Sequence, residues 1–116
     1  MTKALRVKDY LEHILKAIER IERYTDDIDR ASFLCSELIQ DAVIRNIEII
    51  GEASKNIQRV DPAFASIHDH IPWQVMYTMR NRVSHGYDSI DFEIVWNTIK
   101  GALPTLYDQV KVLADN

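Results

Sequence analysis

Apolar residues recur at steps of three and four along most of the chain, which is the spacing of one face of an α-helix. The first such stripe predicts a helix from about Lys3 to Tyr24. A second stripe predicts a long helix that begins after Ser36, whose hydroxyl is suited to cap its first turn. The apolar positions of the two stripes are Val7, Leu11, Ile14, Ile18 and Ile21, then Ile39, Val43, Ile47, Ile50, Ala53 and Ile57. The pattern therefore predicts two long amphipathic helices.

Polar and turn-forming residues divide the rest of the chain into shorter helices. Residues 25–29 are mostly short polar residues whose side chains compete for backbone hydrogen bonds, so we expect them to end the first helix. A short helical turn around Ala31 to Leu34 fits the sequence that follows. Asp61 and Pro62 are typical of the N-cap and first residue of another short helix.

Two further helices are predicted in the last third of the chain. One opens at Ile71-Pro72, runs to Val83 and ends at Gly86, because glycine adopts the left-handed C-terminal conformation without strain. The last begins near Asp91, and Pro104 is expected to kink it because proline lacks a backbone donor. The apolar face of this last helix comprises Ile94, Val95, Ile99, Leu103, Leu106 and Val110.

Gly51 lies inside the second long helix, where glycine costs about 1 kcal/mol relative to alanine. We expect the close approach of a neighbouring helix to be the reason. Glycine and proline, three of each, are too scarce for a sheet protein with many tight turns. The 116 residues are therefore predicted to form one domain, residues 1–116, folded as an all-α up-and-down bundle of four main helices plus short helical turns.

Charge and cysteine content narrow the functional classes. The chain has 14 Lys and Arg residues against 18 Asp and Glu residues, a net charge of −4, which excludes broad nonspecific nucleic-acid binding but leaves room for a small basic site. The single Cys35 excludes an internal disulfide and a multi-thiolate zinc site, and we expect it to pack as a small apolar side chain. The charged N-terminal segment and the shortness of every apolar run predict a cytoplasmic protein without a membrane segment.

One stretch concentrates groups that can do chemistry. Residues 80–87 carry two guanidiniums, an amide, a hydroxyl, an imidazole and a phenol. These groups belong to Arg80, Asn81, Arg82, Ser84, His85 and Tyr87. Arginine suits a phosphate because its fork donates two parallel hydrogen bonds, and histidine moves protons near neutral pH. Together they supply a base for a ribose 2′-OH, an acid for the leaving 5′-oxygen and a cation for the phosphate. The alternative is that these residues merely complement a helix dipole.

The same stretch resembles the R-x4-H-x-Y signature of the HEPN superfamily, with Arg80, His85 and Tyr87 at the fixed places and Asn81 as the preferred polar residue. Residues 41–53, which include the segment Ile-Gly-Glu-Ala, are similar to the long helix of the HepT-like branch. Further similar positions before and after the motif are Ile71, Pro72, Trp73, Val95, Trp96, Leu103 and Pro104. The resemblance covers nearly the whole chain.

This resemblance implies a helical homodimer that acts as a toxin ribonuclease in a two-gene toxin–antitoxin system, without metal or other cofactor. The implied substrate is tRNA or mRNA, and the implied partner is a minimal, MntA-like nucleotidyltransferase antitoxin that adds AMP to Tyr87. Arg80 would clamp the phosphate and His85 would be the general acid and base. Supporting or substrate-positioning roles fall to Asn81, Arg82 and Ser84.

Charge also favours a dimer. One Arg80–His85 pair supplies little positive field on a protein of net charge −4, whereas two copies of Arg80, Arg82 and His85 across a two-fold axis double it. We expect the interface to bury apolar residues that flank the motif.

Two other functions remain open. One is a non-catalytic HEPN subunit that binds a nucleotidyltransferase and nucleotide without cleaving RNA. The other is a plain helical dimerisation domain. The Arg80–His85 pair favours the ribonuclease, because a structural module does not need it.

Several other features have simpler interpretations. The segment His68-Asp69-His70 resembles a cluster of metal ligands, but no further ligand is evident nearby, so we expect an exposed loop. Trp73 and Trp96 are expected to anchor the core, and stacking on RNA bases is the alternative.

Glu48 and Glu52 are one helical turn apart and share a face. Such a pair can bind a divalent metal or do acid–base work, but more often it forms salt bridges with neighbours such as Arg45 or Lys55. Arg45 is itself a candidate to support the active site from this helix.

Overall fold

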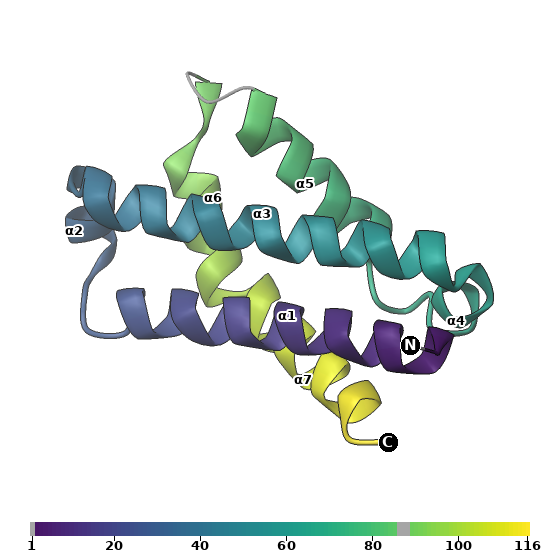
Figure 1. The fold of residues 1–116 in the computed structure, drawn as a ribbon. Helices are drawn as coiled ribbons and strands as arrows, with labels where there is room; N and C mark the ends of the chain where they lie inside the picture. Colours follow the sequence, from purple (N-terminus) through teal and green to yellow (C-terminus); the bar gives the residue numbers. More distant parts are fainter. Residues whose placement is uncertain (1, 86–88) are drawn as a thin grey trace.

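The computed structural model describes residues 2–85 and 89–116, and at positions 84 and 85 the backbone alone. Every regular element of this part of the chain is helical, as the sequence pattern predicts (Figure 1). The helices are α1 (Lys3–Thr25), α2 (Arg30–Cys35), α3 (Glu37–Val60), α4 (Pro62–Ile67), α5 (Trp73–His85), α6 (Phe92–Lys100) and α7 (Ala102–Ala114).

Side-chain caps define where three of these helices begin. The Ser36 hydroxyl accepts from the Ile39 amide at 3.3 Å at the start of α3. The Asp61 carboxylate caps α4, with Pro62 in the first turn, and the Asp91 carboxylate caps α6. Each cap satisfies an amide that has no partner inside its own helix. The predicted starts at these three positions are confirmed.

The long helix α3 is the centre of the bundle (Figure 1). It packs against α1 on one side and against α5 on the other, and α7 packs against α1. Both predicted apolar stripes face this core, with every member buried except the half-buried Ile39. Burial of the two stripes, more than helix propensity, stabilises helices of this kind.

Gly51 marks the closest approach of α3 and α5. A Cβ built at this position would overlap the Cβ of Arg80 and would lie 2.8 Å from the carbonyl oxygen of Met76. One turn further along α3, the buried Ser54 hydroxyl bonds the Ile50 carbonyl and lies 3.6 Å from the sulfur of Met76. The prediction that a neighbouring helix approaches at Gly51 is confirmed, and that neighbour is α5.

The two tryptophans are core anchors, as predicted. Trp73, 4% exposed, donates its indole N–H to the carbonyl of His68 at 3.2 Å and so secures the start of α5. Trp96, 8% exposed, lies with its ring centroid 5.3 Å from that of the fully buried Phe33, and this contact joins α6 to α2.

The interruption of the last helix differs from the prediction. The sequence predicts one helix kinked at Pro104, but α6 ends at Lys100 and α7 begins at Ala102, so the chain breaks at Gly101. Pro104 lies in the first turn of α7, where an amide would lack a partner in its own helix. A continuous helix would instead press the proline ring against the Lys100 carbonyl four residues earlier, so the break precedes the proline.

The expectation for Cys35 is wrong. Its side chain is exposed at the end of α2 rather than packed in the core. The neighbouring Phe33 fills that part of the core instead, with no exposed surface.

Among the described helices, none combines the length and the apolar character needed to cross a bilayer.

We predict that Gly51→Ala lowers the free energy of unfolding by about 1–3 kcal/mol, because overpacking at the α3–α5 contact outweighs the roughly 1 kcal/mol that alanine adds to helix propensity. Chemical denaturation measures the change. Gly101→Ala is the control, because its Cβ would meet only the Asn97 carbonyl oxygen, at 3.2 Å. A Gly51→Ala protein as stable as the wild type would contradict the close contact.

Candidate active site

Arg80 is held on the side of α5 that faces α3. Its Cβ lies against Gly51, so its side chain leaves α5 at the point where the two helices are closest. The Nη2 atom lies 3.5 Å from the Oε2 atom of Glu52, and Nη1 donates to the Oδ1 atom of Asn81 at 3.0 Å. Two contacts from two helices therefore fix the guanidinium.

The guanidinium retains unused donor capacity. The Arg80 side chain is 29% exposed, and within the described residues its buried Nε has no hydrogen-bond partner. Arginine has five N–H donors, of which the hydrogen bond to Asn81 uses one, and the contact with Glu52 is an ion pair at 3.5 Å. Such a preorganised, partly exposed fork is suited to an incoming phosphate oxygen.

Glu52 has a different partner from the one that the sequence predicts. The sequence predicts a salt bridge to a neighbour such as Arg45 or Lys55, but the carboxylate lies beside Arg80 on the neighbouring helix. The Lys55 ammonium instead lies 5.1 Å from the centroid of the Tyr77 ring, and Arg45 is exposed on α3. The acidic residue next to Gly51 is thus part of the arginine site.

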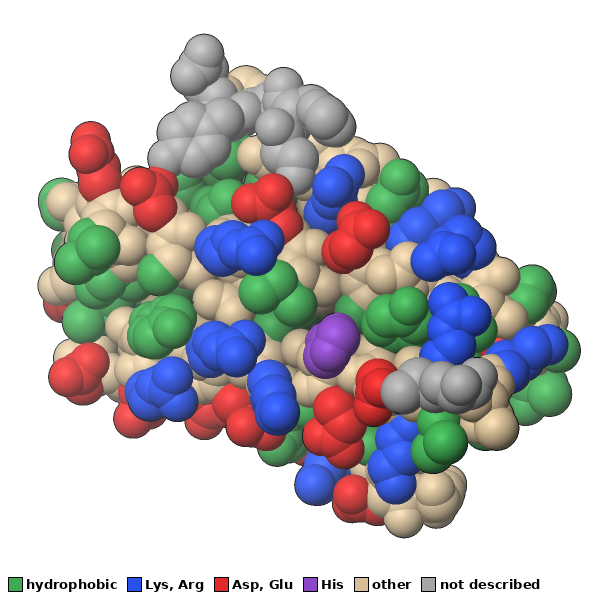
Figure 2. Space-filling view, viewed as in Figure 1, with side chains coloured by type: hydrophobic (Ala, Val, Ile, Leu, Met, Phe, Trp, Pro, Cys, Tyr) green, Lys and Arg blue, Asp and Glu red, His purple; other side chains and the backbone are tan. Residues whose placement is uncertain are grey.

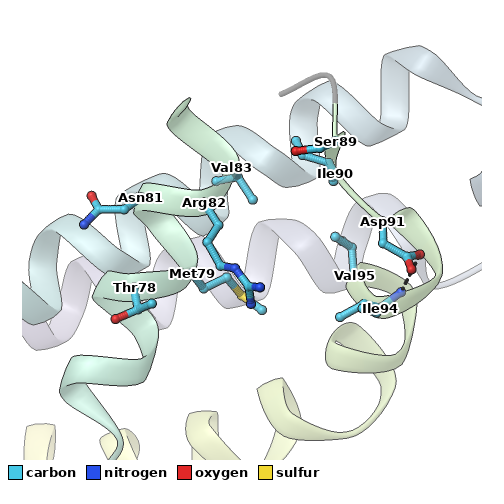
Figure 3. Close-up of a pocket in the computed structure, with 10 residues that line it drawn as sticks. All are labelled: Thr78, Met79, Asn81, Arg82, Val83, Ser89, Ile90, Asp91, Ile94 and Val95. Carbon is cyan, nitrogen blue, oxygen red and sulfur yellow. Dashed lines mark hydrogen bonds between the residues drawn. The ribbon is translucent and has the colours of Figure 1, made fainter. Parts of the chain in front are cut away.

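Arg82 lies on the opposite side of α5. It is exposed and lines a cavity of about 530 Å³ between the C-terminal half of α5 and the start of α6 (Figure 3). In Figure 3 its side chain extends into the space between the two helices, whereas the Asn81 side chain points the other way. The apolar lining of this cavity is Met79, Val83, Ile90, Ile94 and Val95.

The structure therefore separates two arginines that the sequence places two residues apart. Consecutive helical residues are rotated by about 100°, so Arg80 and Arg82 project about 200° apart. Arg80 meets α3, and Arg82 faces α6. Within one chain the two side chains therefore leave α5 on different sides and meet different neighbours.

The rest of the motif is only partly described. His85 is the last residue of α5, and its backbone lies about 7.5 Å along the helix axis from that of Arg80. The side chains of Ser84 and His85 lie outside the described part of the structure, as do Tyr87 and the predicted glycine cap at Gly86.

The His-Asp-His segment forms the turn between α4 and α5, which confirms the loop interpretation. The His68 ring lies 4.6 Å from the Phe64 ring, centroid to centroid. Among residues 2–85 and 89–116 as described, no group of three or more His, Cys, Asp or Glu side chains is arranged to hold a metal ion.

Comparison with known proteins identifies the family. Residues 14–113 match the family described as ribonuclease HepT-like. The chain belongs to this HepT-like family of the HEPN superfamily. It is a family of ribonucleases, so the motif on α5 is the candidate active site of a HepT-like protein.

Individual relatives agree with this assignment. The HepT-like chain is 48% identical over 99 residues to a Thermococcus cleftensis protein named "Probable ribonuclease HepT", covering 85% of this chain and 87% of that one. It is 42% identical over 104 residues to a Methanocaldococcus jannaschii protein whose name joins a gamma-glutamylcyclotransferase to a suspected RNase, covering 90% of this chain and 46% of that one. No solved structure matches the chain.

Sequence reasoning located the motif but missed the residues that α3 contributes. Glu52 and Lys55 reach Arg80 and Tyr77 on α5. The sequence feature that could have located them is Gly51. A glycine inside a helix indicates close packing of another helix, so side chains near Gly51 are candidates to contact that helix.

We predict that Glu52→Ala mobilises the Arg80 side chain with little loss of stability, because the Glu52 side chain is 55% exposed and such pairs contribute about 0–1 kcal/mol. NMR of the arginine Nε–H group should show faster exchange with water at Arg80. The control is Glu93→Ala, which removes the exposed pair with Arg30 and should leave the Arg80 signal unchanged. An unaltered Arg80 signal in Glu52→Ala would show that the carboxylate does not hold the guanidinium.

Proposed function

We propose that this HepT-like protein is a toxin endoribonuclease that cleaves tRNA or mRNA without metal, through the R-x4-H-x-Y motif that begins at Arg80 on α5. Residues 1–116 would act as a single domain in the cytoplasm, where these RNAs occur. The observation that carries the proposal is the Arg80 guanidinium, fixed by Glu52 and Asn81 yet still able to donate. The membership of a ribonuclease family supports the reaction class.

Arg80 would bind the scissile phosphate, and His85 would move the protons. A base removes the proton of the ribose 2′-OH, the 2′-oxygen bonds to phosphorus, and the bond from phosphorus to the 5′-oxygen breaks. A protonated imidazole then gives the leaving 5′-oxygen its proton, and the guanidinium stabilises the charge on the phosphate oxygens. Asn81 would keep Arg80 in place, and Ser84 would help to position the substrate.

The working form would be a homodimer with the two motifs at one cleft. Two copies would supply one imidazole as base and another as acid, and the Arg82 of one chain could join the Arg80 of the other. The apolar cavity beside Arg82 supports this arrangement, because its edge includes Ile94, which is 57% exposed. On the same face of α5, Val75 is 65% exposed one turn before Met79. A second copy would bury these side chains.

The proposed regulator is a minimal, MntA-like nucleotidyltransferase antitoxin that transfers AMP to Tyr87. Tyr87 follows His85 by two residues in the sequence. An AMP group there would add bulk and negative charge next to the motif. It would compete with the RNA phosphate for arginine, which is how an added phosphate commonly acts as a switch.

We predict that Arg80→Ala and His85→Ala each lower RNA cleavage about a hundredfold or more, because each removes a charge or proton-transfer group needed in the transition state. Cleavage of total RNA in vitro and growth arrest on expression are the measurements. Arg30→Ala and His70→Ala are matched controls, since both residues are exposed and lie outside the motif, on α2 and in the turn between α4 and α5. If all five proteins, wild type included, behave alike, the proposed ribonuclease mechanism is refuted.

We predict that the wild-type protein elutes in gel filtration at about twice the 13.5 kDa of one chain. Ile94→Glu should shift it to the monomer and remove cleavage, because a charge at the interface cannot be buried without a partner. Val112→Glu is the control, because Val112 is 62% exposed on α7, away from the cavity. A wild-type monomer, or an Ile94→Glu protein that stays dimeric, would contradict the shared cleft.

A further inference from the structure

We propose that the boundary between α3 and α5 holds one nucleotide of a single-stranded RNA next to the Arg80 site, with a backbone phosphate on Lys55 and a base on the Tyr77 ring. This inference rests on the proposed function and names where the substrate lies. The residues are described in full, and neither belongs to the R-x4-H-x-Y motif.

The first observation is a pair of contacts that repeat along the helix boundary. Glu52 meets Arg80, and Lys55 meets Tyr77. Lys55 comes three residues after Glu52 on α3, and Tyr77 comes three residues before Arg80 on α5. The second contact therefore lies about 4.5 Å along the helix axes from the first. A strand whose phosphate is bound at Arg80, and which runs along this boundary toward the end of α3, would pass beside Lys55 and Tyr77.

The second observation is the chemistry of the pair itself. The Lys55 ammonium lies 5.1 Å from the Tyr77 ring centroid, and the lysine is exposed while the tyrosine is half-buried. Proteins that bind single strands combine a cation for the backbone with an aromatic ring for the base. In the free protein the Lys55 ammonium lies over the face of the Tyr77 ring. Because an exposed cation–π contact is weak, an RNA base can take the place of the ammonium on the ring. The ammonium is then free to contact the backbone phosphate.

The third observation is that positive charge continues along α3. Arg59 is one turn beyond Lys55, is exposed, and donates to the Asn56 side chain at 2.7 Å. Figure 2 shows that Lys and Arg side chains are interspersed with Asp and Glu on this face of the molecule. Such mixed charge disfavours a broad coating of nucleic acid and restricts binding to a narrow path.

RNA fits this surface better than a protein partner does. The contacts lie one turn from the residue proposed to hold the scissile phosphate, and a lysine beside an aromatic ring matches the alternation of phosphate and base in a strand. A protein interface would be expected to centre on exposed apolar side chains, which on α5 and α6 lie at Val75 and Ile94, on the far side from α3.

The test measures binding of a short, mixed-sequence single-stranded RNA whose 2′-hydroxyls are all methylated, so that it cannot be cleaved. Fluorescence anisotropy at several salt concentrations gives the Kd and its salt dependence for the full chain. Lys55→Glu should weaken binding about tenfold and make the slope of log K against log salt shallower by about 0.7, the loss of one phosphate contact. Tyr77→Leu should weaken binding at least about fivefold through lost stacking, whereas Tyr77→Phe should bind like the wild type.

Lys100→Glu is the matched control. It makes the same charge change and also removes a lysine from an aromatic ring, since the Lys100 ammonium lies 4.6 Å from the centroid of Trp96. That pair is on α6, away from the α3–α5 boundary, so Lys100→Glu should leave the Kd and the slope close to wild type. Thermal unfolding of each variant shows whether it is folded, and Lys55→Gln serves if Lys55→Glu is not.

The outcomes separate this inference from the proposed function. Three results would overturn the nucleotide site. One is that Lys55→Glu and Lys100→Glu weaken RNA binding equally, and another is that neither Lys55 variant changes it. The third is that the wild-type protein binds no RNA. Conversely, RNA binding that depends on Lys55 and Tyr77 in a protein that does not cleave RNA would support the site and refute the ribonuclease.

Discussion

The close crossing of α3 and α5 at Gly51 is the contact on which the rest of the site depends. The absent side chain lets the Arg80 backbone approach α3 closely enough for Glu52 to reach the guanidinium. The same approach brings Lys55 to Tyr77 one turn away. The cost of a glycine inside the helix is therefore offset by tertiary contacts that hold Arg80 in place. At Gly51 the residue that favours the helix, alanine, differs from the residue that allows the close α3–α5 contact, and the chain has the latter.

The two arginines of the motif lie in different surroundings on opposite sides of α5. Arg80 is anchored by an acidic residue and an amide, which limits its motion, while Arg82 is exposed beside an apolar cavity. The first arrangement suits a fixed electrostatic group, and the second suits a residue at an interface. In this net-acidic chain, α5 thus presents one guanidinium to the neighbouring helix α3 and another to the cavity beside α6.

Much of the fold follows from local patterns. The apolar stripes predicted the long helices, and Ser36, Asp61 and Asp91 predicted helix starts that their capping bonds confirm. The predictions for Pro104 and Cys35 are wrong because the local sequence around each residue is compatible with two arrangements. Pro104 is compatible with a kink or with a first helical turn, and the glycine three residues earlier allowed the second. Cys35 is small enough to be buried or exposed, and the larger Phe33 beside it filled the core.

The sequence by itself determined which residues are helical, which face of each helix is apolar, and which residues form the family motif, because these depend on neighbours within a few positions. It left open which cation would meet Glu52, since Arg45 and Lys55 on its own helix and Arg80 on another were all compatible with an ion pair. Only the tertiary structure decided this, because the ion-pair partner of Glu52 depends on which faces of two helices meet and on how closely they pack. A periodic stripe specifies that a face is buried, but the packing of α5 at Gly51 selects its partner.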